Sequence, residues 1–167
     1  VPDSVAWDIL VVNNNSSDRT EEAIDAFRGA LPLRSVFEPQ PGLSHARNRA
    51  LAEAAGDCLA WLDDDVLVGD HWLTALADGV IRYPAAHAFG GPIEPWFPTQ
   101  PDPAVIAAFP VLANGFCGLD HGGEATILGP DQHIYGANMT FRRSAIAGLR
   151  FNPALGTSAG SGISGED

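Results

Sequence analysis

The sequence predicts an α/β fold in which a mostly parallel β-sheet is covered by helices on both faces. Short apolar runs typical of buried strands occupy residues 7–12, 33–39 and 57–62. A stretch with helical periodicity follows each of these runs, so strands and helices alternate along the chain. Such alternation favours parallel strands joined by crossover helices.

The first two helices are expected from their capping and periodic patterns. Asp18, with Glu21 three residues later, gives a capping-box-like start to a helix that runs to about Gly29. The second helix is expected over residues 43–56, with Ser44 as its N-cap and apolar residues at helical spacing. These helices would connect the three strands.

The second half of the chain is less regular. Asp70 is expected to cap a third helix. Residues 88–103 indicate a strand followed by a loop rich in proline and aromatic residues, and 103–109 indicate a short helix. Residues 133–148 indicate a strand that leads into a short helix, and the glycine and serine of residues 156–167 predict a loop.

Length and composition indicate one globular domain, because the 167 residues are 46% hydrophobic and no apolar run has membrane-spanning length. The chain begins almost directly on a strand and stops after an acidic pair, so we expect it to be truncated at both ends. Cys58 and Cys117 form no metal or redox motif, which favours free thiols in a reducing compartment. We therefore expect a cytoplasmic location, either free or at the cytoplasmic face of a membrane.

The charge excludes several classes of function. The formal net charge is −12, which argues against a nucleic-acid-binding surface. All nine basic residues are arginines. Because the chain has no lysine, it holds neither the phosphate-binding lysine of a P-loop nor the Schiff-base lysine of a pyridoxal enzyme. A nucleotide ligand remains compatible with this charge where a cation mediates the contact.

The stretch "AWLDDDVLVGD" places three carboxylates at the carboxyl end of the third predicted strand. Open α/β sheets bind ligands at this edge. Alternation along a strand would place Asp63 and Asp65 on one face and Asp64 on the other. Paired carboxylates suit a hard ion such as Mg²⁺ or Mn²⁺, which completes its coordination with phosphate oxygens. A solvated acidic turn is the alternative, and the preceding strand favours the metal.

The same aspartate segment also matches the motif of a different class of enzyme. The segment "LDDDVL" also fits the D-x-D-x-[TV]-L signature of haloacid-dehalogenase-type phosphatases, in which the first aspartate is a nucleophile. Those enzymes usually carry the motif on their first strand and hold the phosphate with a later lysine. Two strands precede it here and lysine is absent, so this interpretation is disfavoured.

Four stretches together resemble family 2 glycosyltransferases of the GT-A fold. They are "ILVVNNNSSDRT", "PGLSHARNRALAEAAGDCLAWLDDDV", "YGANMTFRRSAI" and the terminal "GED", in the order found in that family. The resemblance covers nearly the whole chain. It implies a Rossmann-like GT-A sheet, with a nucleotide-sugar-binding part over residues 1–93 and an acceptor-side part over 94–167.

The resemblance also implies roles for single residues. Asn13 holds the place of an aspartate that binds the nucleobase, and Arg47 matches an arginine near that base. The implied donor site contains Asn13, Asn15, Arg47, Asp63 and Asp64. The implied metal ligands are Asp65 and Asp63.

On the acceptor side, the resemblance implies that Asn138 lines the acceptor site and that Asp167 is the catalytic base, with Glu166 as its alternative. Trp96 offers a ring that could stack on a sugar, although packing beside the neighbouring prolines is the alternative.

The implied reaction transfers a sugar, with inversion, from a nucleotide diphosphate sugar to a hydroxyl group. A UDP-sugar is the favoured donor, a saccharide or lipid-linked molecule the acceptor, and Mn²⁺ or Mg²⁺ the cofactor. The competing hypothesis is a non-catalytic module that binds nucleotides or sugars. The resemblance also implies a first strand, carrying part of the nucleoside pocket, that has no counterpart in this chain. Its absence would leave a sheet edge exposed, so pairing with a second copy of the chain is also expected.

Overall fold

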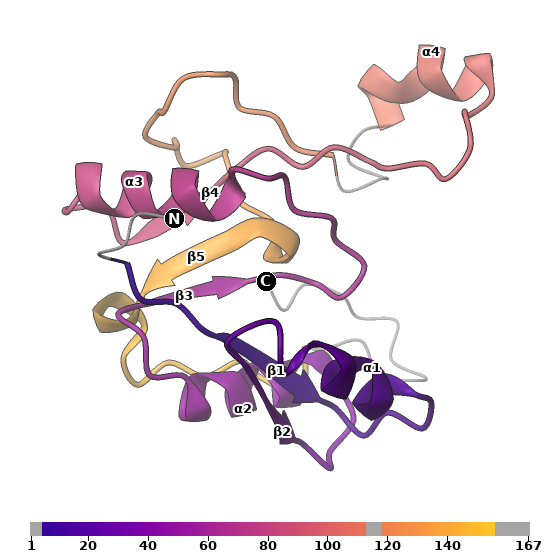
Figure 1. Ribbon diagram of the computed structural model, residues 1–167. Helices are drawn as coiled ribbons and strands as arrows, with labels where there is room; N and C mark the ends of the chain where they lie inside the picture. Colours follow the sequence, from indigo (N-terminus) through magenta and orange to yellow (C-terminus); the bar gives the residue numbers. More distant parts are fainter. Residues whose placement is uncertain (1–4, 113–117, 156–167) are drawn as a thin grey trace. The chain divides into compact units, whose positions relative to one another are not determined.

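The computed structural model describes residues 5–112 and 118–155 (Figure 1). Its internal contacts group the chain into two compact units. The first unit combines Val1–Asp57 with Ile146–Asp167, and the second unit is Cys58–Ala145. The described residues 146–155 are therefore grouped with residues 5–57. A division of the chain at residue 93 stays a prediction.

The first unit is built on a β-α-β element followed by a helix. β1 (Ile9–Asn13) and β2 (Leu33–Phe37) pair in parallel along their whole length, and α1 (Thr20–Phe27) connects them. α1 and α2 (Leu43–Glu53) both pack against β1, and Ile24 of α1 is buried. The parallel pairing confirms the crossover predicted for the first two strands. Neighbouring parallel strands need a long connection, which is usually a helix.

The two helices begin differently from the capping patterns. Asp18 accepts hydrogen bonds from the side chain and the backbone N–H of Thr20, which together lower the pKa of its carboxyl group. The Glu21 side chain does not complete a capping box, because it contacts Asn13 instead. Ser44 is not an N-cap: α2 begins one residue earlier, and the buried Ser44 hydroxyl donates to the carbonyl of Asn152 at 3.3 Å.

The second unit contains a small antiparallel sheet. The central strand β5 (Met139–Arg142) pairs antiparallel with β3 (Cys58–Trp61) on one side and with β4 (Ala88–Gly90) on the other. α3 (Trp72–Arg82) packs against β4. β3, the third strand predicted from the sequence, thus has an antiparallel neighbour that arrives from much later in the chain.

Shorter elements complete the second unit and the chain that follows it. α4 (Pro103–Leu112) begins where the sequence predicts a helix. The 3-10 turns η2 (Gly136–Asn138) and η3 (Arg143–Ile146) flank β5. Asp70 makes no cap, because α3 begins after His71 without a side-chain capping bond. Across the ranges that the structure describes, no helix combines the length and apolar character needed to cross a membrane.

Arg142 joins the end of β5 to the end of α3. Its guanidinium donates to three carbonyl oxygens: those of Val80 and Ala86, each at 2.7 Å, and that of Tyr83 at 3.1 Å. The last carbonyls of a helix have no partner within the helix, and a cation interacts favourably with them. Arg142 therefore fixes the strand that directly follows Asn138.

Candidate functional site

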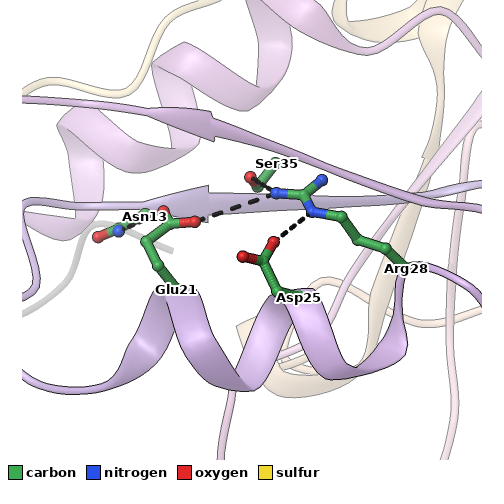
Figure 2. Close-up of polar contacts among 5 residues, drawn as sticks. All are labelled: Asn13, Glu21, Asp25, Arg28 and Ser35. Atoms are coloured by element: carbon green, nitrogen blue, oxygen red, sulfur yellow. Dashed lines mark hydrogen bonds and ion pairs between the residues drawn. The ribbon is translucent and has the colours of Figure 1, made fainter.

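Asn13 ends β1 and lies at one end of the polar network shown in Figure 2. Its side chain is buried, with only 5% of the residue exposed. The amide nitrogen donates to Glu21 Oε1 at 2.6 Å, and the amide oxygen accepts from the Ser16 backbone N–H at 2.9 Å. Both ends of the amide thus bind groups of the protein, so Asn13 orders the loop between β1 and α1. Its contact with a nucleobase stays a prediction.

Arg28 extends this network toward β2. It donates to Asp25 Oδ1 at 2.6 Å and to Ser35 Oγ at 2.7 Å, and it lies 4.0 Å from Glu21 Oε2 (Figure 2). Because these charges are largely exposed, the ion pairs contribute little to stability. They mainly orient the Glu21 carboxylate, because Asn13 binds its Oε1 atom and Arg28 lies near its Oε2 atom.

Replacing Asn13 with aspartate should destabilise the protein, because two carboxylates would then face each other at the position of the 2.6 Å hydrogen bond to Glu21. We expect a loss of about 1–3 kcal/mol in the free energy of unfolding at pH 7, measured by urea denaturation.

The matched test is the double variant Asn13→Asp with Glu21→Gln, which exchanges the amide and the carboxylate. This variant restores one donor and one acceptor across the pair and should recover most of the lost stability. A double variant no more stable than Asn13→Asp alone would contradict the pairing.

The two asparagines after Asn13 shape the same loop. Asn14 donates to the carbonyl of Gln40 at 2.6 Å and accepts from the Gly42 N–H at 2.7 Å, so it holds the loop that leads into α2. Asn15 is exposed and has a φ of 57°, a left-handed conformation that asparagine tolerates better than most residues. Of these two residues, only Asn15 was predicted from the sequence.

One face of α2 meets a distant segment of the first unit. Asn48 donates to the carbonyl of Phe151 and accepts from the Phe151 N–H, each at 2.8 Å. The Arg47 guanidinium lies 5.2 Å from the centre of the Phe151 ring, and Arg47 is only 4% exposed. Arg47, predicted from the resemblance, is therefore enclosed by protein. Asn48 and Phe151 were not predicted from the sequence. The signal for Asn48 was its polar side chain at helical spacing on α2, and Phe151 carried no such signal.

The three aspartates Asp63, Asp64 and Asp65 lie just beyond the end of β3, and all three residues are exposed. The backbone turns there, with the Val66 N–H reaching the Asp63 carbonyl at 3.4 Å. The alternation of a strand therefore does not extend to the trio, and the prediction that Asp63 and Asp65 share one strand face does not apply. Their position after the third strand agrees with the sequence.

The carboxylate oxygens of these aspartates are suitable ligands for a hard divalent cation, because carboxylates exposed to solvent can bind such an ion. Within residues 5–112 and 118–155, no group of three or more histidine, cysteine or acidic side chains has an arrangement suited to a metal. An ion held by one or two carboxylates, with phosphate and water as its other ligands, needs no such group.

Asn138 holds together three parts of the second unit. Its side-chain oxygen accepts from Trp72 Nε1 at 3.0 Å, and its side-chain nitrogen reaches the Pro92 carbonyl at 3.3 Å. A Cβ atom on Gly91 would lie 2.9 Å from this nitrogen, so the glycine allows the close approach. Trp96, by contrast, is 69% exposed and presents its ring to solvent.

The remaining predicted residues, Asp167 and Glu166, lie outside the described residues, as does Cys117. The predicted site residues that the structure describes fall into two sets. Asn13, Asn15 and Arg47 belong to the first unit, whereas the aspartate trio, Trp96 and Asn138 belong to the second. Their roles toward ligands stay predictions.

A family model described as "Glycosyl transferase family 2" matches residues 4–149. The chain belongs to glycosyl transferase family 2. It is 29% identical to the succinoglycan biosynthesis protein ExoM of Rhizobium meliloti, over 96% of this chain and 50% of the relative. It is also 29% identical to the glucosyl-dolichyl phosphate glucuronosyltransferase of Haloferax volcanii, over 61% of this chain and 31% of the relative. The chain thus spans half or less of the length of these two relatives.

Two solved structures share the fold. The glucosyl-3-phosphoglycerate synthase of Mycobacterium tuberculosis, crystallised with UDP, superimposes with a TM-score of 0.52 at 20% identity, over 86% of this chain and 48% of that one. A mycobacterial protein gives a TM-score of 0.53 at 22% identity, over 87% of this chain and 46% of that one. The predicted family and its α/β GT-A fold are confirmed. The family assignment also disfavours the phosphatase alternative.

Proposed function

We propose that the full-length protein transfers a sugar from a nucleotide diphosphate sugar to an acceptor hydroxyl, with inversion at the anomeric carbon. The observation that carries this proposal is the family match over residues 4–149. The exposed carboxylates after β3 support it, because they suit a donor that brings its own phosphates and a cation. The UDP bound to a structural neighbour favours a UDP-sugar as the donor.

The first unit would bind the nucleoside. Arg47 of α2 and the loop of Asn13 and Asn15 are the proposed donor-binding elements. Because Asn13 and Arg47 are buried, we expect them to act largely by fixing the shape of the site, with the exposed Asn15 nearer the ligand. A loop held by such internal bonds needs little reordering on binding, which favours affinity.

The residues proposed to hold the cation and the acceptor belong to the second unit. Asp65 and Asp63 would hold Mn²⁺ or Mg²⁺, which when bound offsets the negative charge of the leaving diphosphate. Asp64 would lie toward the ribose. Trp96 would stack on an acceptor sugar, and Asn138 would support the acceptor side through its bonds to Trp72 and Pro92.

Asp167 is the proposed general base, with Glu166 as the alternative. A carboxylate within hydrogen-bond reach of the acceptor hydroxyl would take its proton as the new glycosidic bond forms. The acceptor is proposed to be a saccharide or a lipid-linked molecule. The names of the two relatives, which refer to succinoglycan biosynthesis and to a dolichyl phosphate, support these two acceptor classes.

Calorimetry of the full-length protein with UDP, GDP and ADP in the presence of Mn²⁺ tests the donor. We expect UDP to bind most tightly and only weakly without the metal. The same preparation should release UDP slowly from a UDP-sugar, because transferases of this kind can pass the sugar to water. Binding without turnover would favour the non-catalytic binding module. No binding of any nucleotide diphosphate would overturn the proposal.

A further inference from the structure

The face of α2 that carries Arg47 is joined to the chain segment Phe151–Asn152 by side chains at helical spacing. Ser44, Arg47 and Asn48 occupy positions i, i+3 and i+4, which lie side by side on a helix. Each of them contacts one of the two residues of the segment. The segment is thus attached to the helix along a whole turn, although 103 positions separate Asn48 from Phe151.

Asn48 makes the most demanding of these contacts. Its amide gives one hydrogen bond to the carbonyl and takes one from the N–H of the same residue, Phe151, and both measure 2.8 Å. An asparagine side chain can make both bonds, because its amide carries a donor nitrogen and an acceptor oxygen. An aspartate keeps only the accepting bond, and its charge would repel the Phe151 carbonyl. The backbone of Phe151 is therefore fixed on both sides of its Cα atom.

The consequence of this fixed backbone is the position of the Phe151 ring. The ring lies with its centre 5.2 Å from the Arg47 guanidinium carbon. A cation close to an aromatic ring is attracted by the ring's quadrupole, most strongly where water is excluded. Arg47 is 96% buried, so the ring limits the conformations that its guanidinium can adopt.

We propose that Asn48 and Phe151 are positioning residues for the donor site: Asn48 fixes the Phe151 backbone, and the Phe151 ring holds the Arg47 guanidinium in the conformation that the donor nucleotide requires. This inference rests on the proposed function, in which Arg47 belongs to the donor site. It assigns a donor-site role to a segment that the chain supplies long after the nucleotide-binding strands.

The test measures the affinity of the full-length protein for UDP with Mn²⁺ by calorimetry. Asn48→Ala and Phe151→Leu should each weaken binding about fivefold, a factor within the range that a cation–ring contact can contribute. Phe151→Tyr keeps the ring and should bind within about twofold of the wild type. Asn48→Asp, which keeps the bond accepted from the Phe151 N–H and loses the bond donated to its carbonyl, should also weaken binding and serves as a second variant if Asn48→Ala fails to fold.

Arg34→Met is the matched control. Arg34 donates to the Glu53 carbonyl at 3.0 Å and so holds the other end of α2. The Arg34→Met variant should have a lower melting temperature and an unchanged affinity for UDP. If it weakens UDP binding as much as Asn48→Ala does, loss of helix stability explains both results and the inference is overturned.

The Arg47→Ala background separates a positioning role from a structural one. If Phe151 acts through Arg47, Phe151→Leu should cause no further loss of affinity in that background. The same fivefold loss in both backgrounds would overturn the inference. A wild type that binds no UDP refutes the proposed function itself, and Arg47→Ala that binds like the wild type removes Arg47 from the donor site. Wild-type affinity in both Asn48→Ala and Phe151→Leu, with weak binding in Arg47→Ala, refutes the positioning role alone.

Discussion

Asp65→Ala in the full-length protein should abolish the metal-dependent part of UDP binding. Asp65 is exposed just after β3, and its carboxylate is the proposed link between the protein and the cation on the diphosphate. Loss of a hydrogen-bond partner of a metal ligand already costs about 10-fold to 100-fold in metal affinity, so loss of the ligand should cost at least about 100-fold. Calorimetry with UDP, with and without Mn²⁺, measures this loss.

Asp70→Ala is the control for charge. Asp70 is exposed and lies in the same connection between β3 and α3, so its removal changes the net charge equally. Its affinity for UDP with Mn²⁺ should equal that of the wild type. Asp63→Ala should weaken metal-dependent binding less than Asp65→Ala does. An unchanged affinity in Asp65→Ala would remove the metal assignment, and an equal loss in Asp70→Ala would show that only the overall charge matters.

The order of helices and strands could be predicted from periodicity, because each element carries its own apolar pattern. The β1–α1–β2 crossover and the strand of residues 58–61 lie close to where the apolar runs predict them. The partner of β3 could not be predicted in this way. β5 pairs Met139 with Trp61, and no local pattern indicates a contact across such a separation.

The predicted capping roles of Ser44 and Glu21 were wrong for a common reason. A capping pattern assumes that a polar side chain binds the nearest free N–H. The Ser44 hydroxyl binds the distant Asn152 carbonyl instead, and Glu21 binds Asn13. Tertiary contacts thus take the side chains that local rules assign to helix ends.

The residues of the candidate site also differ in whether the sequence alone could predict them. The resemblance led to Asn13 and Arg47, because each lies in a short recognisable stretch. The residues around them could not be found that way. Asn14 binds the loop before α2 and Asn48 binds Phe151, and these partners are 26 and 103 positions away from the two asparagines. An asparagine after a strand or on a helix face indicates that such a hydrogen bond can form, but the sequence does not show which residue is its partner.

Asp167→Asn should suppress sugar transfer while leaving the affinity for UDP intact. A positioned general base contributes about 100-fold to 10,000-fold to the rate of such a step, and an amide cannot take the acceptor proton. We therefore expect kcat to fall by that factor with little change in the KM for the donor. Assays of the full-length protein with a UDP-sugar, with its acceptor and with water alone, measure both parameters.

Glu166→Gln decides between the neighbouring carboxylates, because it makes the same chemical change one position earlier. It should keep most of the transfer rate if Asp167 is the base. A fully active Asp167→Asn together with an inactive Glu166→Gln would move the role to Glu166, and full activity in both would place the base elsewhere. The two large effects also differ in kind: Asp65→Ala acts on donor binding, whereas Asp167→Asn acts only after the donor is bound. A protein in which both variants lost UDP affinity equally would have no separate base and metal site, so the division of chemistry proposed for this chain would be wrong.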